Sequence, residues 1–255
     1  MDAWTAGLTP WLEQHPLAGV FSLATITALA TGLGALPFAL MRQVSARGQA
    51  YASAVAGGLM MGATLGLIFE GMARGMVQTL IGVNAGVLFV LATARLLHRY
   101  EVAPDAFSGG DARRMLLMIL VMTVHSFSEG VAVGASFAGG LPLAVFVTLA
   151  IAIHNIPEGI AITAVLRPGG ISVARSAGWS VFSSLPQPLM AVPAFLLVET
   201  FRPALPYALG FAAGAMLLMV LLELLPGAYR EGRRPIVGVL MSAAFFLMLL
   251  FQRML

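Results

Sequence analysis

The sequence contains no cysteine and no lysine, and only 10% of its 255 residues are charged. The absence of cysteine excludes disulfides, thiolate metal ligands and thiol redox chemistry. Soluble domains average about 25% charged residues, so this low charge, together with 59% hydrophobic residues, argues against a soluble fold. The apolar residues form blocks of about 20 residues, the length that an α-helix needs to cross a bilayer. We therefore predict an all-α integral membrane protein.

Eight apolar blocks, separated by polar breaks, are candidate transmembrane helices. Their expected bounds are residues 17–41, 50–70, 76–97, 115–138, 141–166, 177–198, 205–226 and 235–252. The blocks do not alternate as the strands of a membrane β-barrel do, and open strand edges are not tolerated in lipid. Residues 1–255 are expected to form a single transmembrane transporter domain, in which a cytoplasmic loop at about 99–114 is the longest connection.

All 14 basic residues are arginines, and their placement predicts how the helices are oriented. If the N-terminus lies outside the cytoplasm, 11 arginines fall in inner loops, and only Arg74, Arg202 and Arg253 fall outside. Cytoplasmic loops of membrane proteins are enriched in Lys and Arg. Both termini are therefore predicted to lie outside the cytoplasm. The same bias accounts for the basic net charge, so no nucleic-acid partner is expected.

Two similar segments carry ionisable residues inside the fourth and fifth blocks. His125-Ser-Phe-Ser-Glu129-Gly130 matches His154-Asn-Ile-Pro-Glu158-Gly159 at an offset of 29 residues. In each segment, the histidine and the glutamate are four residues apart and share one face of a helix. Consecutive spans cross in opposite directions, so this direct repeat in sequence becomes an inverted repeat in space. Inverted repeats with a site at their interface are typical of transporters.

The residue types in these segments favour a metal site. Ionisable side chains at membrane depth are costly and usually functional. Two imidazoles and two carboxylates suit zinc, ferrous iron and similar divalent cations. We predict that a transported divalent metal ion binds to His125, Glu129, His154 and Glu158, with an occupancy that falls with acidity because ligands must be deprotonated. The alternative, that each His–Glu pair is a buried ion pair, is disfavoured by two copies in register.

Three further residues are candidate metal ligands. Asn155 follows the second histidine and either supplies a neutral oxygen or bonds to a neighbouring helix. Gln187 stands between Pro186 and Pro188 and either donates its carbonyl oxygen to the site or satisfies a backbone carbonyl that the prolines free. Met60 could supply a thioether, although core filling is the default in a chain with 15 methionines.

Two other functions are weighed against metal transport. A membrane-embedded metalloenzyme would use His-Glu-x-x-His as a zinc protease or Glu-x-x-His as a di-iron bundle, whereas both segments here read His-x-x-x-Glu. A proton-coupled carrier of a small organic solute would use the carboxylates as a relay, and their association with two histidines disfavours it. We therefore expect a carrier of divalent metal, with no enzyme activity and no catalytic cofactor.

The sequence resembles the ZIP family of divalent-metal transporters, in particular its bacterial and GufA-like branch. The resemblance covers essentially all eight spans and rests on the two His–Glu segments, on Gly32-Leu-Gly34-Ala-Leu-Pro37 and on Gly214-Ala-Met216 with Glu223-Leu-Leu-Pro226. It implies a ZIP-like bundle with both termini outside and a metal site between spans four and five. It also implies a multi-pass protein of the bacterial inner membrane, with zinc as the main substrate and a homodimer as a candidate assembly.

The resemblance further implies an alternating-access mechanism, in which spans one, four, five and six slide against spans two, three, seven and eight. Family members often form a two-metal centre, and Asn155 fits the pattern of its second half. Ser126 and Gln187 depart from that pattern, and the glutamine removes one negative charge, which disfavours a second metal. Met60 falls near a position in span two that contributes a sulfur in some members.

Overall fold

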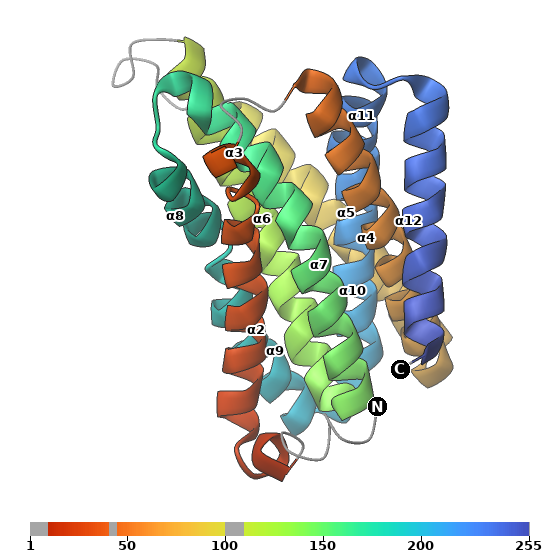
Figure 1. Cartoon of the computed structure of the whole chain (residues 1–255). Coiled ribbons are helices and arrows are strands. Elements are labelled where there is room, and N and C mark those ends of the chain that lie inside the picture. The colour runs from red at the N-terminus through yellow and green to blue at the C-terminus, as the bar shows by residue number, and fades with distance from the viewer. Residues whose placement is uncertain (1–9, 41–44, 100–109, 255) are drawn as a thin grey trace.

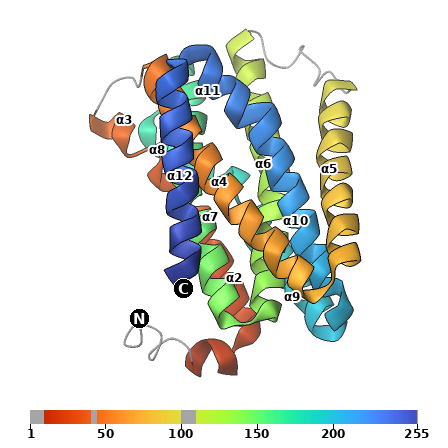
Figure 2. The ribbon, with the colours of Figure 1, turned by 90° about the vertical axis from the view of Figure 1, so that its right-hand side faces the viewer.

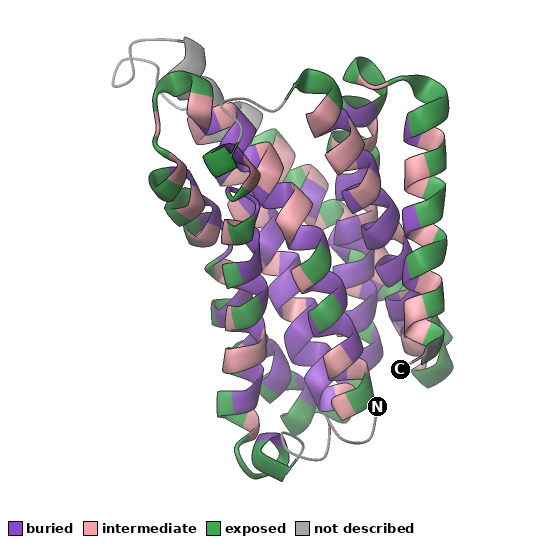
Figure 3. Cartoon of the chain, in the orientation of Figure 1, coloured by how far each residue is buried: buried purple, intermediate pink, exposed green. Residues whose placement is uncertain are grey.

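The structure, a computed structural model, describes residues 10–40, 45–99 and 110–254, and within these ranges the chain is helical with no β-strand. Eight helical segments there are long and apolar enough to cross a membrane: Pro16–Leu40, Ala46–Arg74, Met76–Leu96, Met118–Gly139, Leu141–Gly169, Val173–Thr200, Arg202–Glu231 and Arg234–Arg253. They match the predicted spans in number and order, which confirms the all-α membrane fold. Buried residues lie along the central helices, and large apolar side chains are exposed around the bundle (Figure 3).

Five spans are formed by long unbroken helices. Spans two to five are α4 (Ala46–Arg74), α5 (Met76–Arg99), α6 (Gly110–Gly139) and α7 (Leu141–Leu166), and span eight is α12 (Arg234–Met254). The 3-10 turn η2 (Arg167–Gly169) follows α7. The loop predicted at about 99–114 ends earlier than expected, because residues 110–114 belong to α6. Residues 100–109 of the predicted loop lie outside the described ranges. A helix can continue past its apolar part because its backbone hydrogen bonds are internal.

Spans one, six and seven are interrupted. Span one consists of α2 (Pro16–Leu33) and α3 (Pro37–Leu40), and span six consists of α8 (Val173–Ser183) and α9 (Pro186–Thr200). Span seven runs through η3 (Arg202–Ala204), α10 (Leu205–Met219), the π-helical turn η4 (Val220–Leu224) and α11 (Leu225–Glu231). Proline lacks an N–H and clashes with the preceding turn, so Pro186 begins a new helix. The break places Gln187 in the first turn of α9, where it is fully buried.

A single residue, Gly140, joins α6 to α7, and the two helices form an antiparallel hairpin. Its φ of 122° lies in the left-handed region that favours glycine. The tip of the α6–α7 hairpin lies at the end of the bundle where α2 begins and α12 ends, here named the termini end (Figures 1 and 2). The turns from α4 to α5 and from α9 to α10 lie at the same end. The arginine distribution predicts that this end faces away from the cytoplasm.

Close backbone contacts at glycines join the helices in four pairs, and each pair falls within one of the two groups that the family resemblance implies: spans one, four, five and six form the first group, and spans two, three, seven and eight form the second. In the first group α2 packs on α7, where a Cβ on Gly159 would lie 1.8 Å from Thr31 O, and α6 packs on α9, where a Cβ on Gly134 would lie 2.1 Å from Ala191 O. In the second group α5 packs on α10 and α4 packs on α12. The glycines of the second group that make such contacts are Gly58, Gly82, Gly86, Gly210 and Gly214. Small residues allow this close approach of helices in membranes.

The two groups touch each other mainly through side chains. Phe127 of α6 lies 5.1 Å from Phe89 of α5 and 6.3 Å from Phe211 of α10, measured between ring centroids. Phe146 of α7 lies 6.1 Å from Phe251 of α12. Among the described glycines, none brings α4 against α7, or α6 against α10, in a comparable backbone contact. The contacts between the groups are therefore less interlocked than the four helix pairs within them.

Candidate metal centre

The four residues of the two His–Glu segments meet in the core of the bundle. His125 and Glu129 come from α6, His154 and Glu158 come from α7, and each is at most 3% exposed. One nitrogen or oxygen atom from each of the four lies within 4.8 Å of the others. The i, i+4 spacing explains this meeting, because it gives each helix of the hairpin one face with both donors.

The shortest contacts in the cluster cross between the helices. His154 Nε2 lies 2.6 Å from Glu129 Oε1, and His125 Nε2 lies 3.1 Å from Glu158 Oε1. Within each helix, the corresponding separations are 3.4 Å for His125–Glu129 and 4.0 Å for His154–Glu158. Two separate ion pairs, one on each helix, do not describe this arrangement. The four side chains form one cluster.

The dimensions and charge of the cluster suit a divalent cation. Zinc binds nitrogen and oxygen ligands at about 2.1 Å, which places the ligands of a tetrahedral site about 3.4 Å apart. The separations of 2.6 to 4.0 Å between these nitrogen and oxygen atoms lie around that value. Two carboxylates would neutralise the charge of the ion, and such neutralisation is valuable in a medium of low dielectric constant.

Several buried polar atoms in and beside the cluster have no hydrogen-bond partner among the described residues. They are both ring nitrogens of His125, Oε1 of Glu158 and Oδ1 of Asn155. His125 Nε2 is close to Glu158 Oε1, but the two atoms are not aligned for a hydrogen bond. Buried polar groups are nearly always paired, so unpaired nitrogen and oxygen atoms here fit a site that a cation completes.

The ring of His154 is oriented by the backbone of its own helix. Its Nδ1 lies 3.0 Å from the carbonyl oxygen of Ala150, one turn earlier, and donates a hydrogen bond to it. Such an outer hydrogen bond fixes the ring and leaves Nε2 to face the cluster. The position of the second histidine is therefore set before any ion binds.

An amide network holds Glu129 from the side of α9. Gln187 donates from Nε2 to Glu129 Oε2 at 2.6 Å, and its Oε1 accepts from Thr27 Oγ1 at 2.5 Å and from Asn155 Nδ2 at 3.3 Å. Asn155 Nδ2 also donates to Thr27 O at 2.8 Å. The amide nitrogen of Gln187 faces Glu129 and its carbonyl oxygen faces α2, which favours positioning of the carboxylate over direct ligation. Thr27 was missed in the sequence, because nothing distinguishes a threonine in an apolar span that contains several.

Met60 lies fully buried on α4, in the main hydrophobic cluster of the protein. Its neighbours in that cluster include Leu59, Ala63 and Leu67 of the same helix. Core filling accounts for this burial, and ligation of a metal by its sulfur stays a prediction.

An eight-helix membrane bundle with two histidines and two carboxylates in its core defines a membrane protein that could hold a metal ion between its helices. A model of the ZIP zinc transporter family matches residues 109–231, which include both His–Glu segments. The zinc transporter GufA of Myxococcus xanthus is 33% identical over 81% of this chain and 87% of its own length. The chain belongs to the ZIP family of zinc transporters.

Two further relatives agree with this assignment. The zinc transporter ZIPB of Bordetella bronchiseptica is 33% identical over 86% of this chain and 76% of its own length. A protein of Arabidopsis thaliana named "Putative zinc transporter" is 44% identical over 85% of this chain. The chain spans only 36% of the length of the Arabidopsis protein, so the activity of that whole protein is not carried over to this one.

Proposed function

We propose that the protein is a carrier of divalent metal cations, with zinc as its main substrate. The observation that carries the proposal is the buried cluster of His125, Glu129, His154 and Glu158, whose donor atoms lie within 4.8 Å of one another. Membership of a family of zinc transporters supports a carrier over a membrane-embedded enzyme or a carrier of organic solutes. In this proposal residues 1–255 form one transport domain in the bacterial inner membrane, with both termini outside the cytoplasm.

The packing of the helices suggests how the ion would move. All four proposed ligands belong to the α6–α7 hairpin of the first group, so an ion bound there would move together with that group. The aromatic contacts with the second group are made by side chains that can repack. Sliding of the first group against the second would expose the ion first to one side and then to the other, with its water replaced by imidazole and carboxylate in between. This is the alternating-access mechanism that we propose.

Zinc flux into liposomes tests the carrier function directly. Liposomes that contain the purified protein and a trapped zinc-sensitive dye should take up zinc when it is added outside, and protein-free liposomes should not. The protein carries no nucleotide-binding loop in its sequence, so uptake should follow a zinc gradient without ATP. Zinc-dependent turnover of a peptide or lipid without any zinc flux would contradict a carrier and favour an enzyme.

We propose that the centre holds one ion, and that Gln187 determines this number. The amide nitrogen lies 2.6 Å from Glu129 Oε2, where it donates a hydrogen bond to an oxygen that could otherwise bind a second cation. In Gln187→Glu, a carboxylate oxygen of residue 187 would face Glu129 Oε2 at this distance. The buried Oδ1 of Asn155, which has no hydrogen-bond partner, could then serve as a further ligand. Two facing carboxylates need a cation or a proton between them. The variant should bind two zinc ions per chain, where the native protein binds one.

Equilibrium dialysis followed by atomic absorption measures this number on the purified protein. Gln187→Leu is the matched control, because it removes the amide without adding a charge and should still bind one zinc ion. A single bound zinc ion in Gln187→Glu, at saturating zinc, would show that the amide does not set the number of ions.

A further inference from the structure

Two of the three arginines that the charge distribution leaves outside the cytoplasm contact the same helix end. Arg74 is the last residue of α4, and Arg202 is the first residue of η3. Arg74 Nη2 donates to the carbonyl oxygen of Gly139 at 3.1 Å, and Arg202 Nη1 donates to the carbonyl oxygen of Ala138 at 2.6 Å. Ala138 and Gly139 are the last two residues of α6, at the tip of the α6–α7 hairpin.

The chemistry of a helix end explains why arginines suit this place. The last carbonyls of an α-helix have no partner within the helix, and they carry partial negative charge. Pro142, the second residue of α7, has no N–H to offer these carbonyls. Guanidinium groups supply both the missing donors and the complementary charge.

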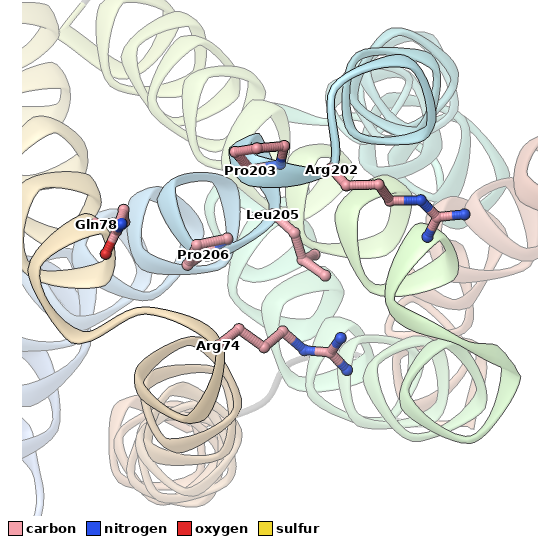
Figure 4. Close-up of a pocket in the computed structure, with 6 residues that line it drawn as sticks. All are labelled: Arg74, Gln78, Arg202, Pro203, Leu205 and Pro206. Atoms are coloured by element: carbon pink, nitrogen blue, oxygen red, sulfur yellow. The ribbon is translucent and has the colours of Figure 1, made fainter.

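Each arginine also forms an ion pair with a carboxylate three or four residues earlier in the chain. Arg74 pairs with Glu70, one turn earlier on α4, and Arg202 Nη2 lies 2.8 Å from Glu199 Oε2 at the end of α9. Both arginines line a cavity of about 360 Å³ at the termini end, together with Gln78, Pro203, Leu205 and Pro206 (Figure 4). The two guanidinium groups reach the hairpin from different elements around this cavity.

The contact of Arg74 crosses between the two groups of helices. Arg74 belongs to α4, in the second group, whereas Gly139 belongs to the hairpin that carries all four proposed metal ligands. Arg202 lies in the turn that connects α9 of the first group to α10 of the second. Both contacts therefore tie the tip of the hairpin to elements outside it. The cluster is closed to water in this conformation, since His154 and Glu129 are 0% exposed.

We propose that Arg74 and Arg202 form a latch that keeps the metal centre closed toward the termini end. The latch consists of the hydrogen bonds that the two guanidinium groups donate to the carbonyl oxygens of Ala138 and Gly139. Release of Arg74 from Gly139 frees the hairpin tip from α4 and lets the first group move away from the second at that end. The proposal rests on the proposed carrier function, for which it supplies the closing contact.

An introduced cysteine can report this opening, because the protein has no cysteine of its own. Ala150 is fully buried and lies one turn from His154 toward the termini end. It shares a face of α7 with Phe146, four residues earlier, which contacts α12 of the second group. In Ala150→Cys, a polar maleimide should therefore label the thiol only when the groups separate at the termini end.

The experiment compares labelling rates in Ala150→Cys with and without the latch, using zinc-free purified protein. Adding Arg74→Met, which keeps the length of the side chain but removes its donors and charge, should raise the rate about tenfold, the effect of one charge-assisted hydrogen bond on an equilibrium. Glu70→Gln, which frees the arginine from its anchor, should raise the rate less. Arg253→Met removes an exposed arginine from the end of α12 and should leave the rate unchanged.

The outcomes separate the latch from the carrier function. Equal labelling rates in all four proteins, or an equal rise in Arg74→Met and Arg253→Met, would overturn the latch. Zinc binding by equilibrium dialysis, measured on the same variants without the reporter cysteine, should stay within twofold of the native protein. If the native protein binds no zinc, the proposed carrier function is refuted. The labelling experiment uses zinc-free protein, so its result does not depend on zinc binding.

Discussion

Replacement of Glu129 by alanine should abolish zinc uptake into liposomes and reduce zinc affinity more than any other single change. Glu129 is 0% exposed and contacts both histidines of the cluster, with Nε2 of His154 at 2.6 Å and Nε2 of His125 at 3.4 Å. Its loss removes one ligand and one of two negative charges, and leaves the amide of Gln187 without its acceptor. Mutation of a residue that only hydrogen-bonds to a metal ligand lowers metal affinity about 10–100-fold. Because Glu129 is itself a proposed ligand, its removal should lower zinc affinity by more than about 100-fold.

Calorimetry with zinc and flux in liposomes measure the two effects of Glu129→Ala. Glu231→Ala is the matched control, because it removes an exposed carboxylate from α11 and should leave both binding and flux unchanged. His154→Ala and Glu158→Ala should also abolish uptake while the protein still inserts into the membrane. Normal uptake by these two variants would refute the assignment of the site.

Replacement of Gly159 by alanine should be the most destabilising change of a single methyl group in the protein. The added Cβ would lie 1.8 Å from Thr31 O and 3.1 Å from Gly34 Cα, so α2 and α7 would have to separate. Backbone atoms cannot give way as the end of a flexible side chain can. Overpacking of a core costs about 1–3 kcal/mol and occasionally more, and separation of the two helices also strains the hydrogen bond from Asn155 to Thr27 O.

Thermal unfolding in one detergent, followed by loss of the monodisperse peak in size-exclusion chromatography, measures this effect. Gly178→Ala on α8 is the matched control, since nothing lies within 4 Å of the Cβ it would add. Alanine is favoured over glycine within a helix by about 1 kcal/mol, so the control should unfold at the same or a higher temperature. Equal unfolding midpoint temperatures for Gly159→Ala and Gly178→Ala would show that the α2–α7 contact is not tight.

The eight helices were predictable because each apolar block is long enough to cross a bilayer without help from its neighbours. The four residues of the cluster were predictable because an i, i+4 spacing places His125 and Glu129 on one face, and the repeat does the same for His154 and Glu158. The breaks in span six were less evident, although Pro186 marks the residue at which α9 begins. Each of these features depends on residues close together in the chain.

The partners within the centre were not predictable in the same way. The i, i+4 spacing places each histidine beside the glutamate of its own segment. In the structure, however, the shorter contacts join His154 to Glu129 and His125 to Glu158. The amide of Gln187 turned out to hold Glu129, with its oxygen on Thr27. Such contacts depend on how each helix is rotated about its axis and on how close the backbones come.

The sequence by itself determined that this protein is a helical membrane protein with two His–Glu faces on consecutive antiparallel spans, because hydropathy, helical period and repeat act locally. The arginine count also singled out Arg74 and Arg202 as exceptions. Only the tertiary structure decided that these two arginines meet the same end of α6, that glycines interlock the helices in pairs, and that each histidine lies closer to the glutamate of the other helix than to that of its own. Those relations join residues far apart in the chain, and packing alone sets them.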